Sequence, residues 1–79
     1  MKMIMKIIRQ EIEARCLWHI ANINDCAELI LENKALGLDE TLTTAWNRLA
    51  LNISLSILSA YDSLLKTNYY DLVKDLADV

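Results

Sequence analysis

The sequence predicts an all-α protein: a long antiparallel helical hairpin with a short C-terminal helix, dimerising into a four-helix-bundle-like core. Its 79 residues include no Pro and one Gly, which favours a few long regular segments over a loop-rich fold. Apolar residues recur every three or four positions over two long stretches, as on one face of a helix. Hydrophobic residues make up 54% of the chain, more than a small monomer buries. We therefore expect a single domain, residues 1–79, that pairs with a second copy.

The first helix is expected over about residues 3–35, which no Gly or Pro interrupts. One apolar face runs along it, formed by Ile8, Ile12, Cys16, Ile20, Ile23, Ala27 and Ile30. Weak helix formers between Asn22 and Asp25 leave a kink open, and the opening residues 2–8 could instead form a short strand. We expect the methionines and isoleucines of this start to pack against the later helices.

A turn at Gly37 is predicted to end the first helix, because glycine suits the left-handed conformation found there. Asp39 or Thr41 can cap the second helix, expected over about residues 40–66. Its main apolar stripe is Leu42, Trp46, Leu49, Ile53, Ile57, Ala60 and Leu64, and its second stripe is Leu51, Leu55, Leu58 and Leu65. Two stripes indicate two buried sides, one against the first helix and one against a partner. Trp46 is expected in the core.

A short third helix is expected over about residues 69–77, capped by Asn68. The charges of the first helix oppose its dipole: Lys2, Lys6 and Arg9 lie at its start, and Asp25, Glu28 and Glu32 towards its end. Two antiparallel copies of this helix would set the basic end of one against the acidic end of the other. Alternatively, acids of the third helix could cover the basic end within one chain, namely Asp71, Asp75 and Asp78.

Six residues are predicted to form a protein-interaction surface for the second copy or another partner: Leu17, Trp18, Leu51, Leu55, Leu58 and Leu65. The last four belong to the second stripe. Trp18 lies off the apolar face of the first helix, and tryptophan is enriched among binding hot spots.

No metal, cofactor or catalytic residue is predicted. Cys16, His19 and Cys26 share a helical face, and Cys and His three residues apart can ligate one metal, but paired Cys-x-x-Cys motifs are missing. Packing is their expected role. The two cysteines stand about 15 Å apart on one helix, too far for a disulfide. The acidic cluster of the first helix is interpreted as a solvated or interchain salt-bridge surface.

The segment Arg15-Cys-Leu-Trp-His19 resembles the Arg-and-His motif of the helical HEPN ribonucleases. That family places four to six residues between Arg and His, whereas this chain places three. On a helix the present spacing still puts both side chains on one face. The resemblance implies an RNA-processing or toxin–antitoxin component that uses Arg15 and His19. The residues themselves favour a pair between Arg15 and Glu11, four positions earlier.

The net charge of −3 argues against non-specific binding to nucleic acid. The longest uncharged run, residues 49–61, is too short to span a bilayer, which takes about 20 residues. We expect a soluble cytoplasmic protein with reduced thiols and neither a nucleic acid nor a membrane as partner. The predicted function is a small non-enzymatic adaptor, regulator or inhibitor, of a kind that phage and plasmid genes often encode, acting as a homodimer on another protein. A purely structural assembly subunit is a further alternative.

Overall fold

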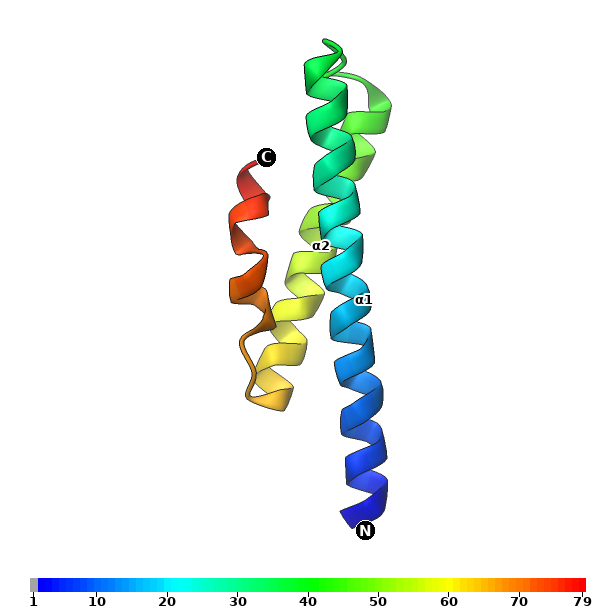
Figure 1. The fold of residues 1–79 in the computed structure, drawn as a ribbon, viewed down its shortest axis with the longest axis vertical. Coiled ribbons are helices and arrows are strands. Elements are labelled where there is room, and N and C mark those ends of the chain that lie inside the picture. Colours follow the sequence, from blue (N-terminus) through cyan, green and yellow to red (C-terminus); the bar gives the residue numbers. More distant parts are fainter. Residues whose placement is uncertain (1) are drawn as a thin grey trace.

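Two long antiparallel helices and a short C-terminal segment form the chain in its computed structural model, which describes residues 2–79, with side chains from residue 3 onward. The elements are α1 (Lys2–Ala35), α2 (Leu42–Leu65) and two 3-10 helices, η1 (Tyr69–Leu72) and η2 (Lys74–Asp78). In Figure 1, α1 and α2 form a hairpin and the C-terminal segment turns back along α2. The predicted all-α hairpin is confirmed, in a molecule of 54 × 17 × 13 Å.

The first helix is continuous from Lys2 to Ala35, so neither the kink nor the opening strand that the sequence left open is present. The weak helix formers in its middle make side-chain hydrogen bonds instead of breaking it. Asn22 Nδ2 donates to Ser54 Oγ of α2 at 2.8 Å, and Asn24 Nδ2 donates to the Ile20 carbonyl one turn back at 3.1 Å. These bonds satisfy the amides without drawing the backbone out of the helix.

The turn between the helices confirms the role predicted for Gly37. Its φ of 74° lies in the left-handed region, and the following N–H of Leu38 donates to the Asn33 carbonyl at 2.7 Å. This bond closes the end of α1 in the manner expected of a C-terminal glycine. Of the two predicted caps, the structure uses Thr41, whose Oγ1 accepts from the Thr44 N–H at 3.2 Å.

The C-terminal segment differs from the predicted α-helix over 69–77, because it forms two 3-10 helices separated at Val73. Asn68 makes no side-chain cap hydrogen bond, so the cap predicted there is wrong. The carboxylate of Asp62 takes this role from α2: it accepts from the N–H groups of Tyr69 and Tyr70 at 2.9 and 2.7 Å. A side chain of the preceding helix therefore fixes where the segment begins.

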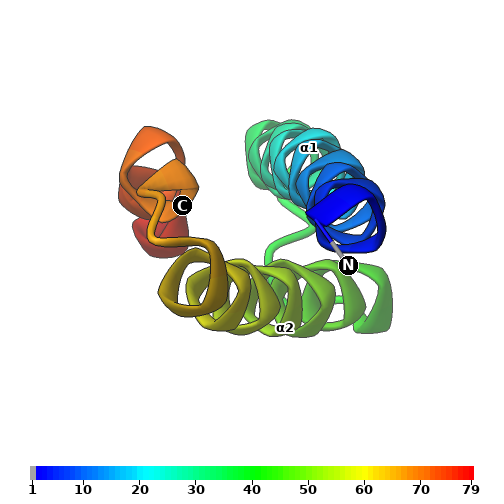
Figure 2. The same ribbon diagram turned by 90° about the horizontal axis from the view of Figure 1, so that it is seen from below.

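The core lies between α1, α2 and the C-terminal segment, which surround it in the end-on view of Figure 2. Three parts of the chain supply its buried hydrophobic residues. These are Cys16, Ile23, Cys26, Ala27 and Ile30 from α1, Leu51, Leu55, Leu58 and Leu65 from α2, and Val73 from the C-terminal segment. Ile12 and Ile20 pack against it half-buried, whereas Ile8 is exposed. The apolar face predicted for the first helix is thus confirmed from Ile12 to Ile30.

The two apolar stripes of α2 lie on opposite sides of the helix, and the second stripe (Leu51, Leu55, Leu58 and Leu65) faces α1. All four leucines of the second stripe are buried within the single chain, whereas Trp46 of the main stripe is 70% exposed. The prediction that Trp46 lies in the core is therefore wrong. The physical reason is hydrogen bonding between the two helices. Ser54 and Thr44 lie on the same side of α2 as the second stripe, and they accept hydrogen bonds from Asn22 and Asn33 of α1.

Candidate interaction surface

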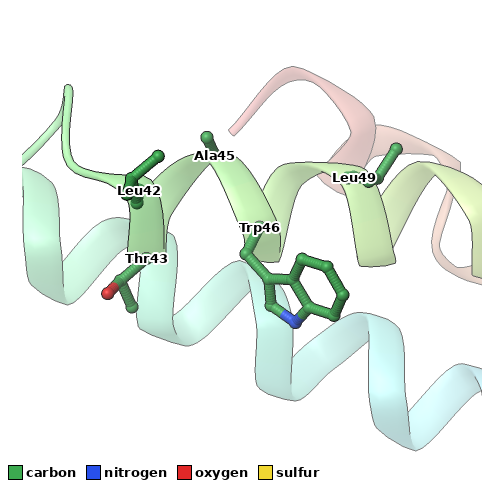
Figure 3. Close-up of a pocket in the computed structure, with 5 residues that line it drawn as sticks. All are labelled: Leu42, Thr43, Ala45, Trp46 and Leu49. Atoms are coloured by element: carbon green, nitrogen blue, oxygen red, sulfur yellow. The ribbon is translucent and has the colours of Figure 1, made fainter.

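The main stripe of α2 is an exposed apolar strip, and we call it the outer stripe: Leu42, Trp46, Leu49, Ile53, Ile57, Ala60 and Leu64. Steps of three and four residues keep its members on one side of the helix along its 24 residues, roughly 36 Å. Leu42 is 89% exposed and Ile53 49% exposed, and only Ile57 is half-buried. Figure 3 shows Leu42 and Leu49 on one side of α2 with the indole of Trp46 turned towards α1.

Two charged residues lie in this stretch of α2, and neither is a member of the outer stripe. Asp62 is buried on the side of the second stripe. The guanidinium of Arg48 donates to the Val79 carbonyl at 2.7 Å. That contact holds Arg48 on the side of the C-terminal segment. The outer stripe is therefore bordered by alanine, serine, threonine and asparagine rather than by charged side chains. An uncharged apolar strip of this length is typical of surfaces that other proteins cover.

A groove between α1 and α2 runs beside the outer stripe and contains a cavity of about 310 Å³. Trp18 and His19 line it from α1, and Trp46, Leu49 and Ile53 line it from α2. Both tryptophans therefore border one hollow, although they come from different helices. Aromatic side chains at the edge of an apolar groove bury much surface when a partner fills it.

His19 lies half-buried at the wall of this groove. Its ring centroid stands 4.9 Å from that of Trp18, edge to face, and 6.0 Å from that of Tyr61. The Nδ1 atom is buried without a hydrogen-bond partner, and burial lowers the pKa of the imidazole. Neutral His19 therefore behaves as part of the groove wall.

Arg15, the other residue of the predicted ribonuclease motif, points to a different partner. Its guanidinium pairs with Glu11 at 3.6 Å, which confirms the predicted i, i+4 pair. Both side chains of that pair are more than half exposed, so the pair contributes little to stability. No hydrogen bond joins Arg15 to His19 among the side chains that the structure describes.

Cys16 and Cys26 are free and buried in the core, as the sequence predicted. Burial raises the pKa of both thiols, and the negative charges of Asp62 and Glu13 add to this at Cys16, as does that of Asp25 at Cys26. Within residues 3–79, no three histidine, cysteine or acidic side chains are grouped so that they could hold a metal ion. Packing is the role that the contacts support for both cysteines.

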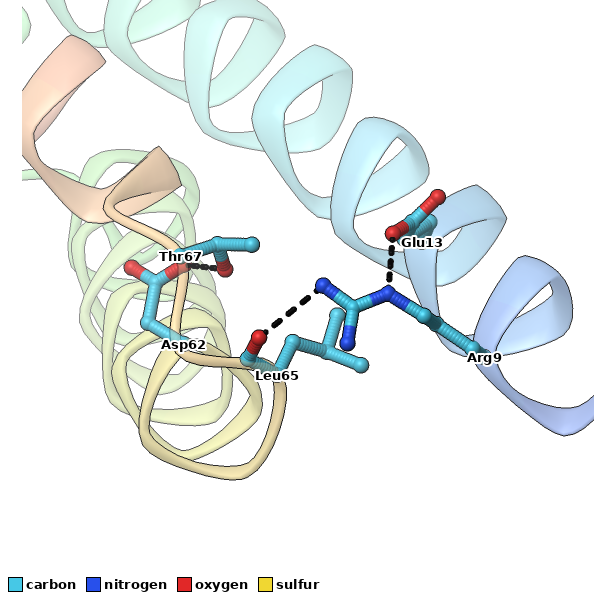
Figure 4. Close-up of polar contacts among 5 residues, drawn as sticks. All are labelled: Arg9, Glu13, Asp62, Leu65 and Thr67. Atoms are coloured by element: carbon cyan, nitrogen blue, oxygen red, sulfur yellow. Dashed lines mark hydrogen bonds and ion pairs between the residues drawn. The ribbon is translucent and has the colours of Figure 1, made fainter. Parts of the chain in front are cut away.

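The start of α1 extends beyond the end of α2 (Figure 1). Arg9 marks the boundary: it pairs with Glu13 at 3.0 Å and donates to the Leu65 carbonyl at 3.0 Å (Figure 4). The apolar side chains that the structure describes before it are exposed: Met3, Ile4, Met5, Ile7 and Ile8. The prediction that they pack on the later helices is wrong, because α2 is too short to reach them.

In the described part of the chain, no helix is long and apolar enough to cross a membrane.

The acids of the C-terminal segment do not cover this basic end. Asp71 pairs with Lys74 of the same segment at 3.5 Å. No ion pair within the described side chains joins these acids to Lys6 or Arg9, while Met1 and the side chain of Lys2 lie outside the described residues.

The six predicted interaction residues divide into two groups in the structure. Leu17 and Trp18 are 60% and 62% exposed, as a partner surface requires. The other four, Leu51, Leu55, Leu58 and Leu65, lie in the core of the single chain, where a partner does not reach them. The outer stripe, which sequence reasoning placed inside, is exposed instead. Neither spacing nor polarity in the sequence would have revealed this, because both stripes have helical spacing and the buried side is the one that carries Thr44, Asn47, Ser54 and Asp62.

No family model, curated protein or solved structure matches this chain.

Proposed function

We propose that this chain is a non-enzymatic protein-interaction module, an adaptor, regulator or inhibitor, that acts as a helical homodimer through its outer stripe. The exposure of a long, uncharged apolar strip on α2 is the observation that carries the proposal. Burying apolar surface stabilises an association by about 25 cal/mol per Å² before the costs of binding are subtracted. A single copy leaves this strip in water.

Pairing through the outer stripe leaves other apolar groups for a further partner. Leu17 lies on α1 and is exposed, as are the side chains of residues 3–8 beyond the end of α2. A closed dimer that still presents such groups suits an adaptor or inhibitor, whereas a subunit that only assembles would use them to grow further. The mass of the complex therefore separates these two roles.

A substitution within the outer stripe tests the proposal. Ile53→Glu places a carboxylate at the centre of the stripe, where the side chain is 49% exposed in the single chain, so we expect the fold of the single chain to tolerate it. We expect the wild-type chain to sediment at about twice its 9.1 kDa mass and Ile53→Glu to sediment as a monomer with unchanged helical circular dichroism.

The matched control is Ser59→Glu, an exposed position of α2 outside the stripe that adds the same charge. We expect this variant to remain dimeric. A wild-type chain that stays monomeric across the micromolar range would refute the homodimer, and a mass that keeps growing with concentration would favour the assembly subunit.

A further inference from the structure

The spacing of the outer stripe is symmetric about its centre. From Leu42 to Leu64 its members follow one another by four, three, four, four, three and four residues. This series reads the same from either end, and Ile53 stands at its centre. Two such helices placed antiparallel, with a two-fold axis at Ile53, bring stripe members to the same level along the whole interface.

We infer that the partner of the outer stripe is a second copy of this chain, packed antiparallel about a two-fold axis at Ile53. This inference rests on the proposed homodimer and adds its direction and register. In this register Leu42 of one copy lies level with Leu64 of the other, and Leu49 lies level with Ile57. Interfaces of this kind are isologous, so every contact occurs twice.

Side-chain size supports the antiparallel register. Trp46, the largest member of the stripe, lies level with Ala60 of the other copy, the smallest member. A large side chain beside a small one fills the space between two helices without a void. Parallel copies would instead set Trp46 against Trp46 and Ala60 against Ala60, which crowds one level and leaves a gap at another.

Charge just beyond the two ends of α2 supports the same direction. Glu40 precedes α2 and Lys66 follows it, both are exposed, and neither makes an ion pair in the described side chains. The antiparallel register sets Glu40 of one copy level with Lys66 of the other, at both ends of the interface. Parallel copies would place like charges together at each end, which is unfavourable.

Single cysteines introduced into the stripe report this register directly. Under a mild thiol oxidant, Ile53→Cys should form a disulfide-linked dimer, because its two copies meet at the axis. Leu42→Cys alone and Leu64→Cys alone should not, since each lies about 33 Å from its own copy in the antiparallel dimer. A mixture of Leu42→Cys and Leu64→Cys should form the mixed disulfide. The wild-type chain is the control, because Cys16 and Cys26 are buried.

The outcomes separate the register from the proposed function. Self-linked Leu42→Cys would show parallel copies and overturn the inference while leaving the homodimer in place. A dimeric mass without any of these cross-links would overturn the register in the same way. Monomeric protein without cross-links would overturn both.

A size exchange gives a second, independent test. Ala60→Trp should weaken the dimer at least tenfold by crowding Trp46 of the other copy, and adding Trp46→Ala in the same chain should restore it. No restoration in the double variant would place these two residues apart and refute the register.

Discussion

Asp62 shows how much of this fold depends on one residue. This residue is 8% exposed, and its carboxylate accepts from Thr67 Oγ1 at 2.6 Å (Figure 4). It also accepts from the two backbone N–H groups of Tyr69 and Tyr70. Burial alone would raise the pKa of this carboxyl, but the hydrogen bonds from Thr67, Tyr70 and Tyr69 together outweigh it and lower the pKa below its ordinary 3.8. The charged form is therefore the one that the fold stabilises.

Asp62→Asn should reduce the free energy of unfolding at pH 7 by about 1–3 kcal/mol, because an amide cannot accept from all three donors. Because the pKa of Asp62 is lower in the folded state, its carboxylate stabilises the folded wild-type chain above pH 3.8. This stabilisation is lost as the pH falls through the pKa of the folded state. Urea unfolding at several pH values should show the wild-type and variant stabilities converging below that pH. Asp71→Asn, exposed beside Lys74, should show no such convergence. An equal gap at pH 7 and pH 2 would contradict this account.

At the scale of elements, the sequence predicted what local chemistry determines. Spacing of three and four residues predicted both helices, and Gly37 and Thr41 predicted the turn, because these signals lie within a few residues of the feature they specify. The start of the C-terminal segment was missed because its cap comes from Asp62, several residues earlier and on another helix. No short-range pattern around Asn68 carries that information.

Gly37→Ala tests the turn. The position has a φ of 74° and no atom within 4 Å of an added Cβ, so backbone strain is the only expected cost. We expect a loss of about 1 kcal/mol in the free energy of unfolding, or about 4–8 °C in the thermal midpoint. Gly37→Asn should lose less, since asparagine tolerates the left-handed region. Equal losses for both variants in thermal denaturation would show that strain is not the cause.

At the scale of the whole molecule, α2 has α1 and the C-terminal segment on one side, and no element of residues 2–79 covers its other side. The sequence predicted two apolar sides for this helix but assigned them the wrong way round, because both stripes have helical spacing. The assignment follows from pairing across the hairpin, where Asn22 and Asn33 of α1 require acceptors on the side they face. The side left over is the outer stripe.

A dimer that covers this side should make thermal stability depend on protein concentration. A tenfold increase favours the paired state by about 1.4 kcal/mol. Dividing this free energy by the unfolding entropy of two chains of 79 residues gives a rise of roughly 4 °C in the thermal midpoint. Calorimetry at three concentrations should show this rise for the wild-type chain and a lower, constant midpoint for Ile53→Glu. A wild-type midpoint that does not move would mean that the outer stripe stays in water as the chain unfolds, and neither the homodimer nor its register would survive that result.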